Sequence, residues 1–320
     1  MSKKHIRKGR VFMLFALTVG TIVGADTIRR DFFAEYDSSI IVDGSFMATQ
    51  TTPQNNNAPA TMLNNNGSAP AQSASGITYL GYSEMNIPAS KLSSGLLAVY
   101  KTGDAMAPVC SADMSFVSDV KNEFYHLRSN DIQLDTQACE ALNRMMSDYN
   151  NATGLSNFVL YSTTQAYTGE DSVYTRSFAE SASGLTVDLA VKGSSRVLEY
   201  DGCDKEAWIT ENCANYGFVV RYPQGCQSAT GEAECVWHLR YVGDVHASIM
   251  KQNNLTLDEY NSWLKKYTIA SPYRTTFNGV SYEIYYTAYM GDSTPVRVPV
   301  SGNYTISGNN TDGFVVTALK

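Results

Sequence analysis

The chain has 320 residues, of which 43% are hydrophobic and 17% are charged. It can therefore bury a sizeable core and is not disordered as a whole. Residues 1–30 carry seven Lys and Arg against one Asp, a local charge of +6, and the rest of the chain is near −13. An acidic body lacks the basic surface that binds a phosphate backbone, which excludes nucleic acid as the expected partner.

Residues 1–30 have the pattern of a targeting segment. A basic stretch precedes an apolar run at residues 11–25, which is shorter than the roughly 20 residues of a spanning helix. Residues 23–25 form an acceptable signal-peptidase cleavage site. A membrane anchor also fits, because extending the run to Ile28 buries only one Asp and the Lys and Arg excess lies on the cytoplasmic side. A cleaved signal peptide and a retained membrane anchor both remain open. In either case we expect an extracytoplasmic protein, secreted or anchored to the cytoplasmic membrane.

Residues 31–76 are predicted to be a flexible spacer. Residues 44–83 contain no Asp, Glu, Lys or Arg, and the middle of this stretch reads QTTPQNNNAPATMLNNNGSAPAQSASG. So few apolar side chains do not offset the entropy cost of ordering the backbone. The folded domain is expected at residues 77–320, with a core at 85–268 and a strand-rich tail at 269–320.

Strand-like and helix-like patterns alternate through this domain. Their spacing predicts a strand at 95–100, a helix at 135–149, a strand at 157–161, a helix that Asp204 caps and Gly217 ends, the strand FVVRY, a Gly-rich hairpin, a helix at 245–250, a helix opened by a Thr256–Glu259 capping box, and strands from Asn278 onward. Short strands mixed with helices indicate an α+β domain with a mainly antiparallel sheet and flanking helices.

The most distinctive segment is WITENCANYGFVVRYPQGCQSATGEAECVWHLRYVGDVHASIM, at residues 208–250. It resembles the zinc D-alanyl-D-alanine carboxypeptidases of the VanY type, whose wider fold group includes lysostaphin-like enzymes and the hedgehog signalling domain. The features that carry the resemblance are Tyr216-Gly217-Phe218, Arg221-Tyr222-Pro223, Gly225, Thr230-Gly231, Trp237-His238, Arg240-Tyr241-Val242-Gly243 and His246. The resemblance spans roughly residues 85–320 and implies a LAS-type fold.

The resemblance implies a zinc ion held by three ligands, with a carboxylate beside the metal-bound water as general base. In the family, the first two ligands form the motif His-x6-Asp, with a Gly three residues after the His. Gly184 and Asp188 match this pattern, but Ser181 stands where the zinc His is expected. In the family, the base and the third ligand are the Glu and the His of a Glu-Pro-Trp-His motif. Trp237 and His238 match, but Cys235 stands at the position of the base.

A third difference lies upstream, in the family's Tyr-Arg-Ser-x-x-Gln motif, whose Arg grips the substrate carboxylate. Tyr161, Thr163 and Gln165 match, whereas Ser162 replaces the Arg. The resemblance thus assigns Tyr161, Ser162, Gln165 and Trp237 to the substrate cleft. All three losses fall on chemical positions while packing and turn residues such as Gly184 remain, which favours a non-catalytic relative, a pseudoenzyme.

Alternatives remain at these positions. A serine hydroxyl is a weak zinc ligand, so Ser181 is interpreted as filling space. Cys235 with Asp188 and His238 could form a rearranged thiolate site, but in an exported chain a disulfide to Cys226 or a buried free thiol is the favoured interpretation of Cys235. Glu234 replaces the base only if its strand slips by one residue, which would turn every side chain over.

His246 is interpreted as a hydrogen-bonded structural residue and not as a metal ligand, because it lies in a helix-like GxxHAxIM pattern outside the ligand motifs.

Three hypotheses follow. The first is an exported, VanY-like envelope protein that binds a peptidoglycan stem peptide or a protein partner, with no cofactor. The second is an active D,D-carboxypeptidase that trims peptidoglycan peptides with zinc at the rearranged site. The third is a structural protein of the envelope whose cleft binds nothing.

Overall fold

The computed structural model describes residues 81–101, 104, 108–161 and 178–320, all within one unit of the chain that spans residues 42–320. The predicted targeting segment and spacer lie outside the described residues, as do Ser162, Thr163 and Gln165. Within the described ranges, no helix combines the length and apolar character needed to cross a membrane.

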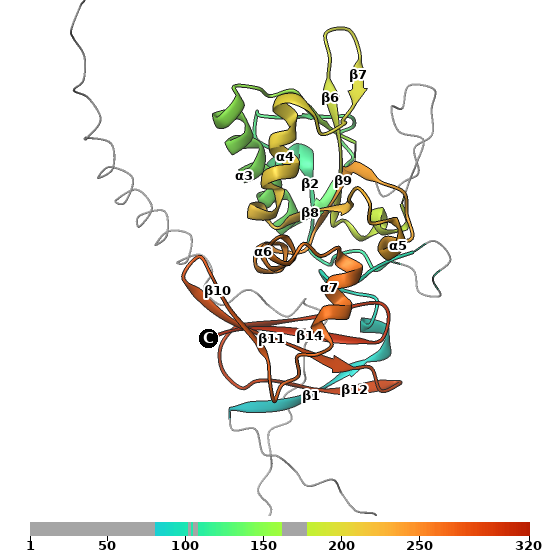
Figure 1. Ribbon diagram of the computed structural model, residues 1–320, viewed down its shortest axis with the longest axis vertical. Coiled ribbons are helices and arrows are strands. Elements are labelled where there is room, and N and C mark those ends of the chain that lie inside the picture. Colours follow the sequence, from blue (N-terminus) through green and yellow to red (C-terminus); the bar gives the residue numbers. More distant parts are fainter. Residues whose placement is uncertain (1–80, 102–103, 105–107, 162–177) are drawn as a thin grey trace, which may run out of the picture. The chain divides into compact units, whose positions relative to one another are not determined.

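Helices and strands follow one another along the described chain (Figure 1). The strands are β1 Tyr82–Pro88, β2 Met114–Phe116, β3 His126–Leu127, β4 Gln133–Asp135, β5 Phe158–Leu160, β6 Thr186–Lys192, β7 Val197–Glu199, β8 Phe218–Tyr222, β9 Cys235–Tyr241, β10 Tyr273–Phe277, β11 Val280–Ala288, β12 Ser293–Pro299, β13 Tyr304–Gly308 and β14 Gly313–Leu319. The α-helices are α2 Val117–Val120, α3 Thr136–Thr153, α4 Ala207–Asn212, α5 Gln227–Thr230, α6 Asp244–Asn253 and α7 Leu257–Leu264, and short 3-10 turns are η1 Ala89–Lys91, η2 Ala179–Ser183, η3 Asp204–Glu206 and η4 Cys213–Tyr216.

The strands form two main sheets. The larger sheet has the order β3-β5-β6-β9-β8, with β7 paired to β6, and only the β3–β5 pair is parallel. The second, called here the C-terminal sheet, has the order β10-β11-β14-β13 and is antiparallel throughout. Two-stranded sheets join β1 to β12 and β2 to β4. Helices beside mainly antiparallel sheets confirm the predicted α+β class.

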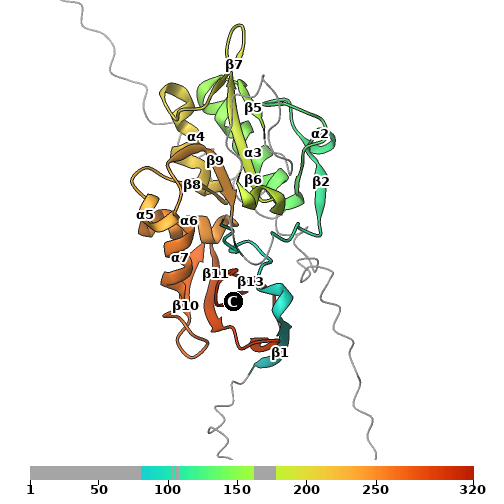
Figure 2. The same ribbon diagram turned by 90° about the vertical axis from the view of Figure 1, so that its right-hand side faces the viewer.

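Three hydrophobic clusters hold these layers together. The first packs α3 against the larger sheet, where β6 is buried along most of its length. The second joins α6 and α7 to Ile284 and Val315 of the C-terminal sheet. Figures 1 and 2 show these two helices between the larger sheet and the C-terminal strands. The third packs β1 and β12 on the C-terminal sheet, so the predicted tail includes a strand from the start of the domain.

Local signals account for the long helix α3. The Asp135 carboxylate accepts hydrogen bonds from the backbone N–H groups of Gln137 and Ala138, and Gly154 ends the helix with φ 75°. Its predicted apolar face is buried from Ala138 to Tyr149. The helix is therefore confirmed and extends to Thr153.

Residues 95–100 are not a strand, contrary to the prediction. Most of the segment is buried, but side chains from distant elements satisfy its backbone: Leu97 N–H donates to Ser307 Oγ at 2.9 Å, Asn261 Nδ2 donates to Leu97 O at 2.8 Å, and Asn310 Nδ2 donates to Val99 O at 2.8 Å. We call residues 92–100 the junction segment. An apolar run predicts burial, but it does not predict which partner the backbone finds.

Two other local predictions need correction. Asp204 does not cap the helix that carries Trp208: it begins the turn η3 with φ 53°, and α4 has no side-chain cap. The connection between β8 and β9 includes the short helix α5, so the predicted Gly-rich hairpin is a longer loop. Gly217 does end this region in the left-handed conformation, as predicted.

Candidate functional site

The candidate site lies where β6 and β9 run side by side. Asp188 of β6 is directly opposite His238 of β9 in the antiparallel register. Both side chains are buried. The structure therefore brings together two of the residues that the sequence assigns to metal binding.

Both ring nitrogens of His238 face carboxylates. Nδ1 is in close contact with Asp188 Oδ1, and Nε2 lies 3.5 Å from Glu180 Oε1. The ring stacks on Tyr222 at 5.6 Å between centroids, and Phe178 lies 4.2 Å away on a tilted plane. These contacts fix both the position and the orientation of the imidazole.

Glu180 is the central residue that the sequence analysis missed. It is fully buried on the turn η2, which Gly184 ends with φ 76°. Its carboxylate accepts hydrogen bonds from Arg240 Nη1 at 2.7 Å and Tyr222 Oη at 2.7 Å, and Arg221 Nε lies 3.0 Å from Oε1. A signal was present: an Arg inside each of two apolar strands requires a buried counter-charge.

The charges in this cluster shift one another. Burial alone would raise the pKa of Glu180, but Arg221, His238 and Arg240 outweigh it and hold that pKa well below its usual range. Burial alone would lower the pKa of His238, but Asp188 and Glu180 outweigh it and raise that pKa. The pair favours a carboxylate at Glu180 and an imidazolium at His238.

Ser181 and Cys235 are neighbours of this cluster in the fold. Ser181 follows Glu180 in the turn, and its backbone N–H donates to Phe178 O. Cys235 is buried at the start of β9, opposite Tyr222, and a register shift in the β8–β9 pairing lies between that pair and the pair Val220–Leu239. All six cysteines fall in the described ranges and are thiols, so Cys226 and Cys235 form no disulfide.

These residues do not fit the expected zinc site. A catalytic zinc takes three protein ligands and an open position. In the part of the chain that the structure describes, no three His, Cys, Asp or Glu side chains are grouped closely enough to hold a metal. Asp188 and His238 are two donors, and one His238 nitrogen already contacts Asp188 while the other faces Glu180.

The predicted cleft residues are only partly described. Tyr161 is buried, and its backbone N–H donates to Asp188 O at 2.7 Å, which ties the end of β5 to β6. Trp237 is largely buried, and its Nε1 donates to Glu199 Oε1 at 3.0 Å. Ser162 and Gln165 lie outside the described residues.

The family model for VanY, described as D-alanyl-D-alanine carboxypeptidase, matches residues 177–244, which contain Glu180, Asp188 and His238. Over these residues this chain resembles the VanY family. The enzymes of the family are zinc-dependent and act on the cell wall. The matched residues include the whole of η2, β6, β8 and β9, which carry the cluster described above.

Two curated relatives are similar to parts of this chain. A D-alanyl-D-alanine carboxypeptidase of Enterococcus faecium is 34% identical over 204 residues, which cover 61% of this chain and 64% of that protein. The bifunctional D-Ala-D-Ala dipeptidase and carboxypeptidase VanXYC of Enterococcus gallinarum is 44% identical over 50 residues, 16% of this chain and 26% of its own length. The chain thus spans less than two thirds of the length of both relatives.

A solved structure confirms the expected fold. The vancomycin-resistance D,D-dipeptidase VanXYg, in complex with a D-Ala-D-Ala phosphinate analogue, superimposes with a TM-score of 0.61 at 22% identity. The match covers 75% of this chain and 99% of that chain. At this identity the likeness concerns the fold alone, which is the LAS-type fold that the resemblance implied.

Proposed function

We propose that this chain is an exported, non-catalytic VanY-family protein of the cell envelope that binds a peptidoglycan stem peptide without cleaving it. The observation that carries the proposal is the environment of His238, whose two ring nitrogens face the carboxylates of Asp188 and Glu180. Among the residues that the structure describes, no group of three His, Cys, Asp or Glu side chains is arranged to hold a metal ion. Catalysis also lacks its base, because the matching position holds the thiol of Cys235.

The remaining residues support binding better than chemistry. Trp237 and Tyr161 are held by hydrogen bonds to Glu199 and to the backbone of Asp188, which supports the proposal that these two residues help to frame a binding cleft. The named relatives act on D-Ala-D-Ala compounds. A peptide with that ending is therefore the ligand class we propose, with a protein partner of the envelope as the competing occupant.

Metal analysis together with a turnover assay tests the non-catalytic assignment. The purified protein should contain far less than one zinc per chain and should release no D-Ala from a pentapeptide. Stoichiometric zinc with turnover would overturn the proposal. If that zinc and turnover were both lost in Cys235→Ala, they would establish the rearranged site of Asp188, His238 and Cys235.

Retention on purified peptidoglycan tests the binding role. The protein should be retained, and Trp237→Ala should reduce retention because the indole belongs to the family's cleft. Trp263→Ala is the matched control, since Trp263 lies on α7 outside that cleft. Absence of retention would favour a protein partner or a purely structural role.

Restoring the lost residues gives a further prediction. The double variant Ser181→His with Cys235→Glu should regain zinc binding, because it restores the third ligand and the base. It should show little D-Ala release while Ser162 remains, since no guanidinium grips the substrate carboxylate. Zinc content and D-Ala release are measured beside Ser181→His alone. Full activity without an Arg at position 162 would show that Ser162 is misassigned.

A further inference from the structure

Residues from four neighbouring strands form a row across one face of the larger sheet. His238 of β9 is opposite Asp188 of β6, and Asp188 O accepts a hydrogen bond from the N–H of Tyr161 at the end of β5. The N–H of Arg128 donates to Leu160 O at 2.9 Å, which continues the parallel β3–β5 register and places Arg128 beside Tyr161. Opposed residues of a sheet project to the same face. Arg128 therefore extends the row of the candidate site to the edge of the sheet.

The Arg128 guanidinium is available to a ligand. It lies over the Tyr161 ring, 5.8 Å from the ring centroid. The side chain is exposed, and among the residues that the structure describes it forms no ion pair. A guanidinium that stacks on an aromatic ring keeps its N–H donors free for an anion. The row thus ends in a cation that the fold itself does not use.

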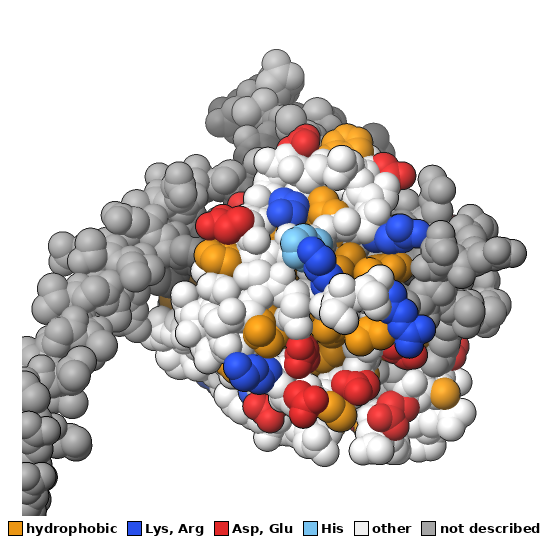
Figure 3. Space-filling view, turned by 90° about the horizontal axis from the view of Figure 1, so that it is seen from above, with side chains coloured by type: hydrophobic (Ala, Val, Ile, Leu, Met, Phe, Trp, Pro, Cys, Tyr) orange, Lys and Arg blue, Asp and Glu red, His pale blue; other side chains and the backbone are white. Residues whose placement is uncertain are grey.

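Further positive charge lies beside Arg128. His126 precedes it by two residues on the same face, and burial, followed by the charges of Lys192 and Lys121, lowers the pKa of His126. Lys192 likewise forms no ion pair anywhere in the described ranges. Figure 3 shows basic side chains gathered beside a histidine on one face of the molecule. We call Lys121, His126, Arg128 and Lys192 the basic corner.

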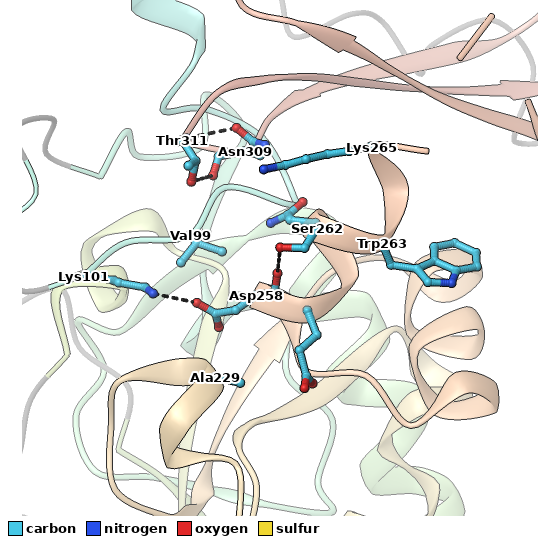
Figure 4. Close-up of a pocket in the computed structure, with 11 residues that line it drawn as sticks. Val99, Lys101, Ala229, Asp258, Ser262, Trp263, Lys265, Asn309 and Thr311 are labelled. Carbon is cyan, nitrogen blue, oxygen red and sulfur yellow. Dashed lines mark hydrogen bonds and ion pairs between the residues drawn. The ribbon is translucent and has the colours of Figure 1, made fainter. Parts of the chain in front are cut away.

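Basic side chains elsewhere in this acidic protein have acidic partners. Lys101, beside the cavity drawn in Figure 4, pairs with Asp258 at 3.1 Å. Arg274 of β10 pairs with Glu283 at 2.9 Å. The basic corner therefore carries positive charge that its own surroundings leave unneutralised, and such charge attracts an anion.

The position of Arg128 indicates which anion it meets. Three strand intervals of about 4.8 Å separate the Cα atoms of His238 and Arg128 by roughly 14 Å. An extended peptide advances about 3.3–3.6 Å per residue, so a peptide whose D-Ala end lies beside His238 brings residues about three or four positions earlier to Arg128. Their carboxylates are distinct from the terminal carboxylate, whose arginine Ser162 replaces.

We infer that the basic corner makes the cleft selective for a peptide with an acidic residue upstream of its D-Ala-D-Ala end, and that Arg128 binds this carboxylate. The inference rests on the proposed function, because it takes a peptide in the cleft as the ligand. A guanidinium offers a carboxylate two parallel N–H donors, whereas the Lys192 ammonium adds charge without that geometry.

Two synthetic peptides test the charge preference by calorimetric titration of the full-length protein. Acetyl-Glu-Glu-Ala-D-Ala-D-Ala and its Gln-Gln analogue differ only in charge. Adjacent side chains of an extended peptide point to opposite sides, so one Glu faces the sheet in either register. The acidic peptide should bind about fivefold more tightly, the upper range for an exposed ion pair.

Equal affinity for the two peptides would overturn the inference and leave the proposed function standing. Failure of both peptides to bind would also overturn it, and retention on peptidoglycan then decides the proposed function separately.

Variants assign the preference to Arg128. Arg128→Gln should bind the two peptides equally, whereas Arg128→Lys should keep part of the preference, because the charge stays and the paired N–H donors are lost. Arg274→Gln is the matched control: it removes the same charge from the C-terminal sheet, where Arg274 is 70% exposed, and it should keep the fivefold preference. Loss of the preference in both Gln variants would assign it to net charge and refute the inference.

Two further outcomes distinguish the basic corner from other sites and ligands. Trp237→Ala should weaken both peptides by the same factor, because the indole belongs to the proposed cleft, and loss of the preference there would contradict the role of Arg128. Inorganic triphosphate tests the other anion class. If it bound more tightly than the acidic peptide and lost that affinity in Arg128→Gln, the basic corner would be a phosphate site and the inference would be wrong.

Discussion

Glu180 is the residue on which the centre of the molecule depends. Three carboxylates meet three cationic groups in this cluster: Glu180, Asp188 and Asp258 with Arg221, Arg240 and His238. Such a cluster adds little stability compared with an apolar core of the same volume. Removal of one member, however, leaves its partners buried without a counter-charge. The cluster therefore specifies how η2, β8 and β9 sit together.

Glu180→Gln should lower the free energy of unfolding by about 3–5 kcal/mol, because Arg221 and Arg240 lose the charge that both contact. Urea denaturation followed by circular dichroism measures the change. Glu234→Gln is the matched control, since Glu234 is exposed and a surface substitution stays within about 0.5 kcal/mol. Equal stability of the two variants would refute a structural role for the cluster.

His246 predicts a dependence of stability on pH. It is buried, with Nδ1 2.8 Å from Tyr260 Oη and Nε2 2.9 Å from Thr317 Oγ1. These contacts confirm the structural role predicted from the sequence. Burial lowers the pKa of His246 from 6.5 to about 4. The unfolded chain takes up this proton first, so the stability contributed by His246 is complete above pH 6.5 and falls as the pH drops toward 4.

By about pH 5 the protonation of His246 should lower the free energy of unfolding by about 2 kcal/mol, because each pH unit between the two pKa values contributes about 1.36 kcal/mol. Urea denaturation at about pH 7.5 and about pH 5 measures it in the wild type and in His246→Gln. The difference between the two proteins isolates this residue, because His238, whose pKa is raised, titrates in both. Identical pH dependence in the two proteins would contradict the assignment.

At the scale of elements, α7 is specified by its first turn. Thr256 Oγ1 accepts a hydrogen bond from Glu259 N–H while the Glu259 side chain accepts from the Thr256 N–H, which confirms the predicted capping box. The helix packs Tyr260 and Leu264 into the second cluster. It thereby places Asn261 against the junction segment, where its Nδ2 donates to Leu97 O.

Thr256→Ala should destabilise the protein by about 1 kcal/mol, because the backbone N–H of Glu259 loses its partner. Thermal and urea denaturation measure the effect. Ser262→Ala on the same helix serves as the control, since Ser262 is exposed, and it should change stability by less than about 0.5 kcal/mol. A cap effect no larger than the control would mean that tertiary packing alone holds this turn.

At the scale of the whole molecule, the junction segment joins the larger sheet to the C-terminal sheet. Arg240 Nη2 donates to Ala98 O at 3.0 Å from one side, and Ser307 Oγ accepts from Leu97 N–H at the other. Gly308 lies against the same segment, where an added Cβ would be 2.2 Å from Leu92 O. This close approach requires a glycine.

Gly308→Ala should therefore cost about 3 kcal/mol, since backbone must move to admit the methyl group. Gly231→Ala isolates the cost of left-handed backbone: it has φ 80° and no atom within 4 Å of the added Cβ, so about 1 kcal/mol is expected. Unfolding free energies rank the two variants. A larger loss of stability in Gly231→Ala than in Gly308→Ala would show that the backbone of the junction segment moves at little energetic cost.

One face of the molecule carries charges of both signs. Basic and acidic side chains both appear on the face seen in Figure 3, with hydrophobic side chains between them. A face of mixed sign gives no continuous basic track for a nucleic acid backbone.

The sequence by itself determined the features that depend on near neighbours. The Asp135 cap, the apolar spacing of α3 and the Thr256–Glu259 box all act within one or two helical turns, so their partners are visible in the local pattern. The motif positions of Asp188 and His238 were likewise readable, together with the losses at Ser181 and Cys235.

Only the tertiary structure decided which distant groups meet. Glu180 contacts Arg221 and Arg240, 41 and 60 residues away, and residues 95–100 bond side chains more than 140 residues away in place of a strand. Burial demands a partner for every charge and backbone group, but sheet register and packing select that partner. The motif positions of Asp188 and His238 were therefore predictable, whereas the ion cluster around His238 was not.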